Sequence, residues 1–454
     1  MPYQSINPAT GETLASVETW DNSTLERTLV AVDEANRVWA STALLKRCEL
    51  LRRAAQQLRE DKEKLAATVT REMGKLIAEA EAEVQKCALG CEYYAEQGAA
   101  FLQDEIIKTD AGNSYVCYQP IGTVLAVMPW NFPLWQVFRF AAPALVAGNT
   151  GVLKHASNVP QCALAIEAVL NNAGFPANVF RTLLISAAQV PSVIENPIIK
   201  AVTLTGSEPA GRQVAAHAGA NLKKSVLELG GSDPFVVLED ADLEHTVKNA
   251  VTSRFLNAGQ SCIAAKRFIV VQGIAEEFLR RLRTAVEALK AGDPMDRATT
   301  LAPLARRDLR GELHRQVTDS IAAGARVVTG CAPVAGPGAF YQASILADIK
   351  PGMRAYDEEL FGPVALVIIA TDEAHALRIA NDTRFGLGGS VWTRDPQRGE
   401  AFARQLQAGS VFVNGFVKSD PRLPFGGIKA SGYGRELSHH GLHEFVNIKT
   451  VWIR

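Results

Sequence analysis

The sequence has 454 residues, more than the roughly 250 to 300 at which a single hydrophobic core tends to divide, so we expect two or more packed units. It is 47% hydrophobic and 21% charged, and 47 basic residues nearly balance 48 acidic ones for a formal net charge of −1. This balance excludes the basic character of a nucleic-acid-binding protein.

The predicted elements begin with helices. Residues 23–102 are rich in Ala, Leu, Glu, Lys and Arg, with apolar residues every three or four positions. An extended segment follows at 113–119, and a buried strand at 121–127. Strand-like runs then alternate with helical stretches, at 151–154, 179–185, 201–205, 226–229, 235–238, 268–271, 364–370, 389–393 and 410–414. Such alternation is typical of parallel sheets covered by helices, so we predict an α/β fold.

The last stretch, residues 444–454, alternates in strand fashion. A strand at the end of a chain exposes unpaired backbone N–H and C=O groups, which promote association with other chains unless another strand pairs with it. Oligomerisation is one way to cover such an edge. The first eight residues show no basic region followed by an apolar run, and no apolar stretch reaches the about 18 residues needed to span a bilayer. We therefore expect a cytoplasmic protein that does not contact membranes.

The cysteines and histidines give little sign of a metal or a disulfide framework. Seven cysteines form an odd set without a Cys-x-x-Cys pair, so we expect reduced thiols. Three histidines near the end lack further ligands at zinc-like spacing, and we predict no metal site at His439, His440 and His443.

The strongest local signal is Asn-Ala-Gly-Gln-Ser-Cys at residues 257–262. Glycine and small residues let the backbone run close beside an exposed thiol, which makes Cys262 a candidate nucleophile. The alternative is a small core residue, the commoner place for a lone cysteine. A thiolate nucleophile needs a lowered pKa, a partner base and donors for the oxyanion that forms when it adds to a carbonyl.

Two residues are candidates for the base and the donor. Glu228 ends a strand-like run between apolar neighbours, where partial desolvation would raise the pKa of its carboxyl toward the range of a general base. Asn131 lies between prolines 129 and 133 at a strand terminus, where its amide could point into a cleft. The alternatives are a strand-end salt bridge for Glu228 and a turn-forming role for Asn131.

The strand at 201–205 leads into a turn that contains Gly206, Ser207 and Gly211, followed by a helical run. Free backbone N–H groups and the dipole of the helix would face a diphosphate at this turn. The spacing differs from Gly-x-Gly-x-x-Gly, so a plain strand-to-helix connection remains the alternative.

Seven short motifs then occur in order, namely Pro129-Trp-Asn-Phe-Pro133, Val152-Leu-Lys154, Thr205-Gly-Ser207, Leu227-Glu-Leu-Gly-Gly231, Gly259-Gln-Ser-Cys262, Glu359-Leu-Phe-Gly-Pro363 and Pro424-Phe-Gly-Gly427. With these motifs, the chain resembles the aldehyde dehydrogenase superfamily over essentially its whole length. The resemblance implies a Rossmann-type cofactor domain, an α/β catalytic domain, a small oligomerisation element, and assembly into a homodimer or homotetramer.

In this sequence we place the cofactor domain at 1–103 and 120–229, and the catalytic domain at 230–430. The oligomerisation element would comprise a hairpin at 104–119 and the strand at 440–454, and in the family it lies across a neighbouring subunit.

The resemblance also implies roles for single residues. Cys262 would be the nucleophile, Glu228 the general base, and Asn131 an oxyanion donor together with the backbone N–H of Cys262. The sulfur would add to the aldehyde, hydride would leave for the nicotinamide to give a thioester, and Glu228 would activate the hydrolytic water. The implied cofactor-binding residues are Trp130, Lys154, Gly206, Ser207, Gly211, Glu359 and Phe361.

Two positions bear on the substrate. Arg139 stands where succinate-semialdehyde dehydrogenases carry the arginine that grips the substrate carboxylate, a task suited to a bidentate guanidinium. Ser419 matches a serine that assists it. The chain is thus most similar to the shorter bacterial succinate-semialdehyde dehydrogenases. A surface salt bridge at Arg139 and another acidic or short aliphatic substrate, such as glutarate semialdehyde, remain alternatives.

Ser157 bears on the cofactor. NAD-preferring relatives commonly have a glutamate at this position that repels a 2′-phosphate. A neutral hydroxyl beside Lys154 and His155 predicts that NADP is accepted and preferred and that NAD is the second cofactor. The alternative is that Ser157 only caps the following helix. Because Ser261 precedes Cys262, the nucleophile has no adjacent cysteine with which to form a disulfide.

Two further alternatives are disfavoured by the same residues. A binding protein that has lost its chemistry would not be expected to keep Cys262, Glu228 and Asn131 together. A relative that passes its thioester to coenzyme A is disfavoured because Glu228 provides a base that activates water.

Overall fold

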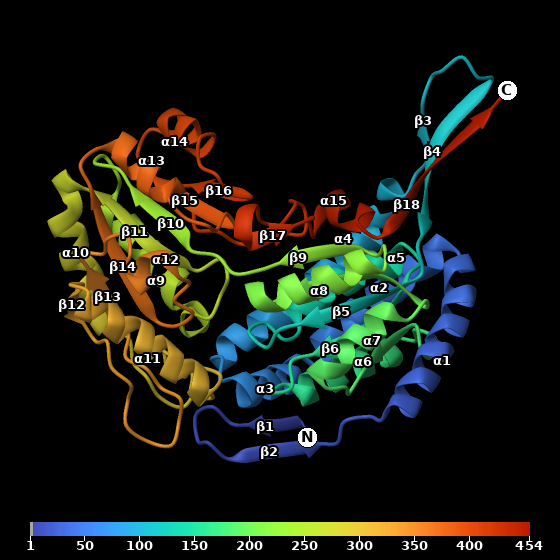
Figure 1. The fold of residues 1–454 in the computed structure, drawn as a ribbon, viewed down its shortest axis with the longest axis horizontal. Helices are drawn as coiled ribbons and strands as arrows, with labels where there is room; N and C mark the ends of the chain where they lie inside the picture. The colour runs from blue at the N-terminus through green and yellow to red at the C-terminus, as the bar shows by residue number, and fades with distance from the viewer. Residues whose placement is uncertain (1–2) are drawn as a thin grey trace.

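The structure, a computed structural model, describes residues 3–454 and contains two large β-sheets, each with helices packed on it, and two small ones (Figure 1). This arrangement confirms the predicted α/β class. No helix in the described part of the chain combines the length and the apolar character that a membrane span requires.

The first large sheet has six strands in the order β17-β9-β8-β5-β6-β7. Its strands are β5 (Thr123–Met128), β6 (Thr150–His155), β7 (Phe180–Thr182), β8 (Ile199–Thr205), β9 (Lys224–Glu228) and β17 (Gly432–Tyr433). All pairs are parallel except β17 with β9, so the carboxyl ends of five strands meet at one edge. That edge is where ligands bind in open α/β sheets.

Helices from the first half of the chain pack around this sheet. They are α1 (Asn22–Ser41), α2 (Leu44–Glu60), α3 (Lys62–Met73), α4 (Ile77–Phe101), α5 (Trp135–Val146), α6 (Pro160–Asn172), α7 (Val190–Glu195) and α8 (Glu208–Ala220). The first four fill the region predicted to be helical. A hairpin of β1 (Tyr3–Ile6) and β2 (Thr13–Val17), which the sequence analysis did not predict, precedes them.

The second large sheet has seven strands in the order β12-β13-β14-β11-β10-β15-β16. They are β10 (Asp233–Val237), β11 (Ala265–Val271), β12 (Arg326–Thr329), β13 (Ser344–Ala347), β14 (Val364–Ala370), β15 (Gly388–Trp392) and β16 (Ser410–Val413). The helices of this half are α9 (Leu243–Phe255), α10 (Gln272–Glu287), α11 (Arg307–Ala322), α12 (Arg354–Asp357), α13 (Glu373–Asn381) and α14 (Pro396–Ala403). The central strands β10, β11 and β15 are buried throughout, as expected for a sheet covered on both faces.

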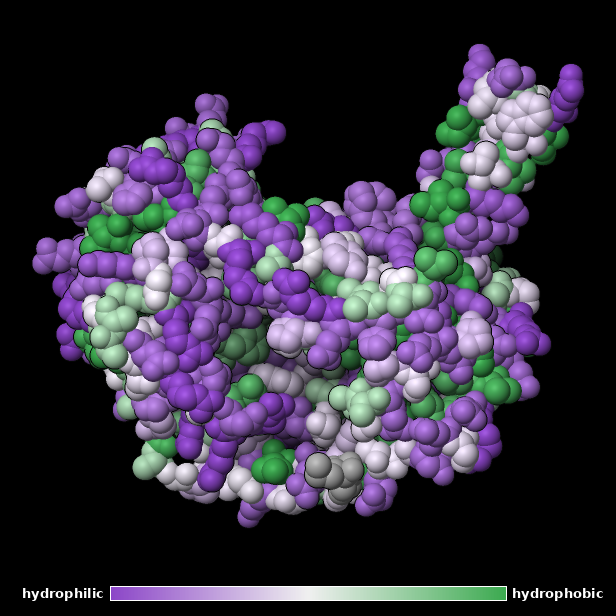
Figure 2. All heavy atoms as spheres, viewed as in Figure 1, coloured by the Kyte–Doolittle hydropathy of each residue, from purple (hydrophilic) through white to green (hydrophobic). Residues whose placement is uncertain are grey.

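A three-stranded arm projects from the body of the molecule (Figure 1). It consists of β3 (Glu105–Ile106), β4 (Asn113–Pro120) and β18 (Val446–Ile453), and β18 follows the short helix α15 (Ser438–His443). The arm carries exposed apolar side chains, which Figure 2 shows in green among polar ones. Ile106, Ile448 and Trp452 are 72%, 60% and 51% exposed.

Candidate active site

Two cavities meet at Cys262, between the two large sheets. We call the first the edge cavity, because it lies at the carboxyl edge of the six-stranded sheet. It encloses about 260 Å³, and its lining includes Trp130, Asn131, Gly206, Ser207, Glu359 and Phe361. We call the second, of about 100 Å³, the helix cavity; its lining includes Lys86 of α4, Trp135 and Arg139 of α5, and Phe416 and Ser419 of the loop after β16. Cys262 and Gln136 line both. Figure 2 shows this face of the molecule hollowed between the two halves.

The loop that carries Cys262 has an unusual backbone. Asn257, Ala258 and Gly259 lie in succession at φ values of 53°, 52° and 73°, and the left-handed region is rare for the two residues that have a Cβ atom. The buried side chain of Asn257 holds this shape, because its Nδ2 donates to the carbonyls of Asn131 at 2.8 Å and Gln260 at 3.1 Å. Cys262 is thereby fixed against the Asn131 segment.

Two hydrogen-bond donors beside the sulfur each have one hydrogen that no other group in the described part of the chain accepts. Asn131 Nδ2 donates one hydrogen to the Gln260 carbonyl at 3.1 Å, which leaves its second amide hydrogen free. The backbone N–H of Cys262 donates to no group within residues 3–454. These donors can stabilise a negative oxygen that forms next to the sulfur.

The thiol of Cys262 is more basic than a nucleophile requires. Burial raises its pKa to about 12, while the charges of Arg139 and Lys266 act in the opposite direction. The lowered pKa expected for a thiolate is therefore not found in the structure without ligands, and the thiol needs a base to take its proton.

Glu228, at the end of β9, is the candidate for this base. Its side chain is 1% exposed, and neither carboxyl oxygen has a hydrogen-bond partner. A Cβ atom on Gly426 would lie 2.7 Å from Glu228 Oε1, so the glycine makes room for the carboxyl group. Burial and the neighbouring Glu436 raise the pKa of Glu228 well above its usual range. The strand-end salt bridge considered from the sequence is not formed, since Glu228 makes no ion pair among the described residues.

Lys266, which the sequence analysis missed, connects the nucleophile to the edge cavity. Its side chain is fully buried, and its ammonium donates to the carbonyls of Ser261 at 2.9 Å and Cys262 at 2.8 Å. It also forms an ion pair with Glu359 at 3.0 Å. The only signal in the sequence is a pair of adjacent basic residues, Lys266 and Arg267, in the otherwise apolar strand β11.

The lining of the edge cavity suits a dinucleotide. Phe361 lies edge-on to Trp130 with ring centroids 5.8 Å apart. A Cβ atom on Gly230 would lie 2.2 Å from Glu359 Oε2, so only glycine lets that carboxylate lie there. The helix α8 begins at Glu208, directly after Gly206 and Ser207, and brings its first N–H groups to this end of the cavity. Aromatic rings, a carboxylate for ribose hydroxyls and a helix N-terminus together fit NAD or NADP.

Three predicted cofactor residues lie outside the edge cavity. Gly211 is buried where α8 packs on Leu229, and a Cβ atom there would lie 2.6 Å from Leu229 Cδ2. Lys154, at the end of β6, is half-buried and makes no ion pair within residues 3–454. Ser157 is exposed in the next turn, and the N-cap of α6 is Val159, so Ser157 does not cap that helix.

His155, beside Lys154, faces inward. Its Nε2 lies 2.8 Å from the Pro133 carbonyl, and burial lowers its pKa to about 4. Of the two basic residues that precede Ser157 in the sequence, His155 is therefore neutral, and the positive charge comes from Lys154.

Arg139 is neither on the surface nor free. It is 2% exposed, forms an ion pair with the buried Glu436, and donates to Thr205 Oγ1 at 3.3 Å. Its guanidinium carbon lies 4.6 Å from the ring centroid of Phe425. The alternative of a surface salt bridge is wrong, and the charge of Arg139 is already balanced in the interior.

Ser419 lies in the helix cavity beside a cation that the sequence analysis did not single out. Lys86 Nζ donates to Ser419 Oγ at 2.6 Å, and Trp135 Nε1 donates to the same oxygen at 3.1 Å. Because a hydroxyl accepts two hydrogen bonds and donates one, the Ser419 hydrogen remains available to a ligand. Burial, and next the charge of Arg139, lower the pKa of Lys86 to about 8.

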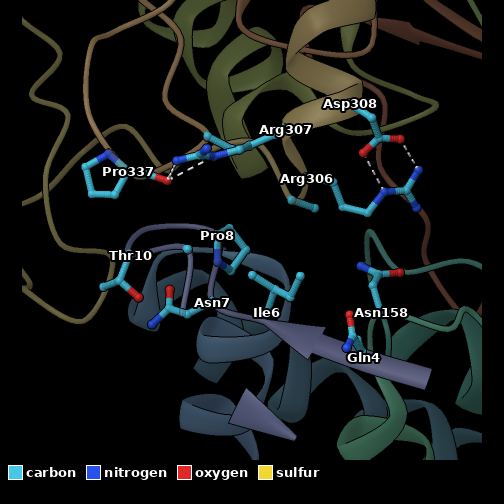
Figure 3. A pocket seen from close by; sticks show the side chains of 13 residues that line it. Gln4, Ile6, Asn7, Pro8, Thr10, Asn158, Arg306, Arg307, Asp308 and Pro337 are labelled. Carbon is cyan, nitrogen blue, oxygen red and sulfur yellow. Dashed lines mark hydrogen bonds and ion pairs between the residues drawn. The ribbon is translucent and has the colours of Figure 1, made fainter. Parts of the chain in front are cut away.

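A separate cavity of about 470 Å³ lies beside the β1–β2 hairpin (Figure 3). Arg306 bonds Asp308 at 2.8 and 2.9 Å, and Arg307 donates to the Pro337 carbonyl at 3.0 Å. The side chain of Asn158 points into the cavity without a hydrogen-bond partner. Its lining contains no cysteine, so this cavity is not a site for the predicted chemistry. Within residues 3–454 no group of three or more His, Cys, Asp or Glu is placed to hold a metal ion.

Comparison with known proteins agrees with this geometry. Residues 1–451 match the model of the aldehyde dehydrogenase family. The chain is 50% identical to a probable succinate-semialdehyde dehydrogenase [NADP(+)] of Synechocystis sp., over all of both chains. It is also 50% identical to the succinate semialdehyde dehydrogenase [NAD(P)+] Sad of Escherichia coli, over 99% of this chain and 97% of that one. Among solved structures, succinic semialdehyde dehydrogenase from Streptococcus pyogenes in complex with NADP+ superposes with a TM-score of 0.98, at 39% identity and 99% coverage of each chain.

Proposed function

The chain belongs to the aldehyde dehydrogenase family, and we propose that it oxidises succinate semialdehyde to succinate, with NADP as the preferred cofactor and NAD as the second. The curated relatives named above support this substrate and these cofactors.

The observation that carries the substrate proposal is the charge of the helix cavity. Three cations line it, Lys86, Arg139 and Lys418, and none of its lining residues is an aspartate or glutamate. Cys262 lines the same cavity. An aldehyde with a carboxylate at its far end matches this distribution, because one end meets the sulfur while the other meets positive charge. The free hydroxyl hydrogen of Ser419 adds a donor for that carboxylate.

For the cofactor, we infer that the edge cavity holds the nicotinamide half of NADP and that α8 faces its diphosphate. Trp130, Glu359 and Phe361 would contact the nicotinamide ring and ribose, and Gly206 and Ser207 the diphosphate. Lys154 and Ser157 would lie at the adenosine ribose, where a lysine without an ion-pair partner favours the 2′-phosphate. Gly211 would contribute by letting α8 approach the sheet.

The first half of the reaction depends on Cys262. Glu228 takes the proton of the thiol, directly or through water, and the sulfur forms a bond to the aldehyde carbon. The carbonyl electron pair moves to oxygen, and this oxyanion accepts hydrogen bonds from Asn131 Nδ2 and the N–H of Cys262. Donors held in place in this way typically lower a barrier by about 3 kcal/mol each. The ion pair of Lys266 with Glu359 keeps the sulfur in a fixed position relative to the edge cavity.

When bound, the nicotinamide supplies the hydride acceptor that this oxidation requires. The chain then carries the acyl group as a thioester on Cys262. Glu228 first releases to solvent the proton that it took from the thiol. It then removes a proton from water, and the water oxygen forms a bond to the thioester carbon while the C–S bond breaks and the thiolate leaves. Because Glu228 makes no ion pair, its carboxyl group is free to exchange protons in both halves of the reaction.

We also propose that the chain forms a homodimer or homotetramer through the arm of β3, β4 and β18. Its exposed apolar side chains and the free edge of β18 support this proposal. We further propose that the six-stranded sheet and its helices form the cofactor-binding domain, and that the seven-stranded sheet and its helices form the catalytic domain that carries the nucleophile.

Steady-state rates on three aldehydes test the proposal. We expect kcat/KM for succinate semialdehyde with NADP to exceed that for butanal, which has the same chain length and no carboxylate, by about 100-fold or more. A higher kcat/KM for glutarate semialdehyde would transfer the proposal to the longer acid. An equal kcat/KM for butanal would contradict it, and product analysis with and without coenzyme A shows whether water is the acyl acceptor.

A further inference from the structure

The two donors of the proposed oxyanion hole come from loops that are far apart in the sequence. Asn131 lies in the loop between β5 and α5, and the N–H of Cys262 lies in the loop between α9 and β11. Two hydrogen bonds join the loops, from Asn257 Nδ2 to the Asn131 carbonyl at 2.8 Å and from Asn131 Nδ2 to the Gln260 carbonyl at 3.1 Å. Donors stabilise an oxyanion only within hydrogen-bond distance of it, so the relative position of the two loops decides whether both donors reach the same oxygen.

Helix α4 contacts both loops through two carboxylates. Glu83 Oε1 accepts from the backbone N–H groups of Leu134 at 2.9 Å and Trp135 at 3.0 Å, at the start of α5. Glu79 Oε1 accepts from the backbone N–H of Asn257 at 3.1 Å. Because positions four residues apart lie on the same face of a helix, a single face of α4 holds the start of α5 and the start of the nucleophile loop.

The contact with the Asn131 loop is rigid. Glu83 forms an ion pair with Lys75, and the two side chains are 1% and 0% exposed. The ammonium of Lys75 lies 3.7 Å from the ring centroid of Phe132, the residue that follows Asn131. Removing Lys75 or Glu83 would leave an unpaired buried charge, so these two residues hold the loop and the stability of the fold together.

The contact with the nucleophile loop depends on Glu79. Its bond to Asn257 meets the loop where three successive residues, 257–259, have left-handed backbone angles. Such a backbone persists only where surrounding contacts hold it. Glu79 Oε2 is buried without a hydrogen-bond partner, and Glu79 makes no ion pair within residues 3–454. A carboxyl group so poorly compensated is costly to bury, and its bond to Asn257 is the contact that explains its place.

We propose that Glu79 is a positioning residue, which sets the nucleophile loop relative to the Asn131 loop so that both oxyanion donors reach one oxygen. Glu79 lines neither the edge cavity nor the helix cavity, so it acts through Asn257 and not on a ligand. This inference rests on the proposed function, since it takes Asn131 and the N–H of Cys262 as the oxyanion donors. The effect should be the same for every aldehyde, because each forms the same oxyanion.

Three variants of Glu79 test the role of its hydrogen bond. Glu79→Gln keeps an acceptor oxygen, Glu79→Leu removes it, and Glu79→Asp keeps the charge but withdraws the oxygen by one methylene. We expect kcat with succinate semialdehyde and NADP to fall about 30-fold in the Leu and Asp variants, less than the loss of a whole donor, and by less than about threefold in the Gln variant. KM for the aldehyde and Kd for NADP should change by less than about twofold.

Urea denaturation shows whether each variant is folded, and the Gln and Asp variants decide the question if Glu79→Leu does not fold. The matched control is Glu81→Leu, on the same helix, where Glu81 pairs at the surface with Arg297. It should lower kcat by less than about twofold. Glu79→Gln as impaired as Glu79→Leu, or full activity in the Leu and Asp variants, would overturn the positioning role and leave the proposed function standing.

A double-mutant cycle with Asn131→Ala separates positioning from a general structural effect. Once Asn131 has lost its amide, its alignment no longer matters, so adding Glu79→Leu should lower kcat by less than about threefold. A further 30-fold loss in the double variant would overturn the positioning role alone. Unchanged kcat in Asn131→Ala by itself would instead overturn the oxyanion hole of the proposed function, and the role of Glu79 with it.

Discussion

The edge cavity and the helix cavity share Cys262 but are built by different means. The edge cavity lies at the ends of neighbouring strands, and its lining includes the rings of Trp130 and Phe361 and also Gly230, which leaves room for the carboxylate of Glu359. The helix cavity is made of long side chains that converge from α4, α5 and the loop after β16. The residues of the edge cavity lie in short motifs at strand ends, so the local sequence positions them. The helix cavity forms only when segments that are distant in the sequence pack together. Changes in one cavity should therefore leave the selectivity of the other intact.

The largest effect is expected for a residue that lies in the wall of neither cavity. Glu228→Gln should lower steady-state turnover by about 1,000-fold, because the amide can accept neither the proton of the thiol nor that of the hydrolytic water. The ratio of succinate semialdehyde to butanal turnover and the ratio of NADP to NAD turnover should both stay as in the wild type. Stopped-flow absorbance at 340 nm measures the burst and the steady-state rate. A change in either ratio would show that Glu228 belongs to one cavity after all.

Arg139→Met tests whether Arg139 serves the structure or the substrate. Removing the guanidinium leaves Glu436 buried without its partner, which should lower the free energy of unfolding by about 3 to 5 kcal/mol. Urea denaturation measures this change. The activities with succinate semialdehyde and butanal should fall by the same factor. A selective loss of the acid would instead assign the substrate carboxylate to Arg139, as the sequence analysis predicted.

Ser157→Glu should change the preference between NADP and NAD without changing the binding of the aldehyde. A carboxylate at this exposed turn would repel the 2′-phosphate and accept hydrogen bonds from a free ribose, so KM for NADP should rise about 30-fold while KM for NAD falls. Initial rates at saturating aldehyde measure both constants. The matched test is KM for succinate semialdehyde, which should not move. Unchanged cofactor preference would contradict the role assigned to Ser157.

The smallest effect is a pH dependence of the helix cavity. Lys86, with its pKa lowered to about 8, binds a carboxylate only in its protonated form. The ratio of kcat/KM for succinate semialdehyde to that for butanal should therefore fall about fourfold between pH 7 and 8.5. The ratio cancels the titration of Cys262 and Glu228, which both substrates share.

The other charged groups around Lys86 do not compete in this range. Glu83 is paired with Lys75, and burial raises the pKa of Cys87 well above its usual range. Asp420, bonded to Arg422, has its pKa lowered to about 2 and stays ionised. A ratio that stays flat from pH 7 to 8.5 would show that the charge of Lys86 does not contribute to the binding of the substrate carboxylate.

The contrast between the cavities also explains what could be predicted from the sequence. Buried parallel strands are continuous apolar runs, and the run at 364–370 coincides with β14. The run at 179–185 was too long, since β7 covers only Phe180–Thr182, and the strands β12 and β13 have too few apolar residues in sequence to stand out. Short exposed strands such as β2 have little burial pattern to detect.

The site residues also divide into those that lie in short sequence motifs and those that only tertiary packing brings together. Cys262, Glu228 and Asn131 were found because each lies in a short motif at a strand end or sharp turn. Lys86 could not be found, because a lysine on a long helix usually indicates a solvated face, and only the packing of α4 against α5 and the 416–419 loop encloses it. The ion pair of Arg139 with Glu436 joins residues on α5 and beyond β17, and nothing in either local sequence indicates it.

The arm has a consequence for how the chain is made. The strand β4 leaves the ribosome early, but every residue from Asn113 to Pro120 pairs with β18, the last strand in chain order. Until β18 is synthesised, β4 has only the two-residue strand β3 as a partner and exposes its other edge in the nascent chain. The two-residue strand β17 likewise joins β9 only late in synthesis. Completion of the arm, and of any assembly through it, therefore waits for the synthesis of β18 rather than for the folding of either large sheet.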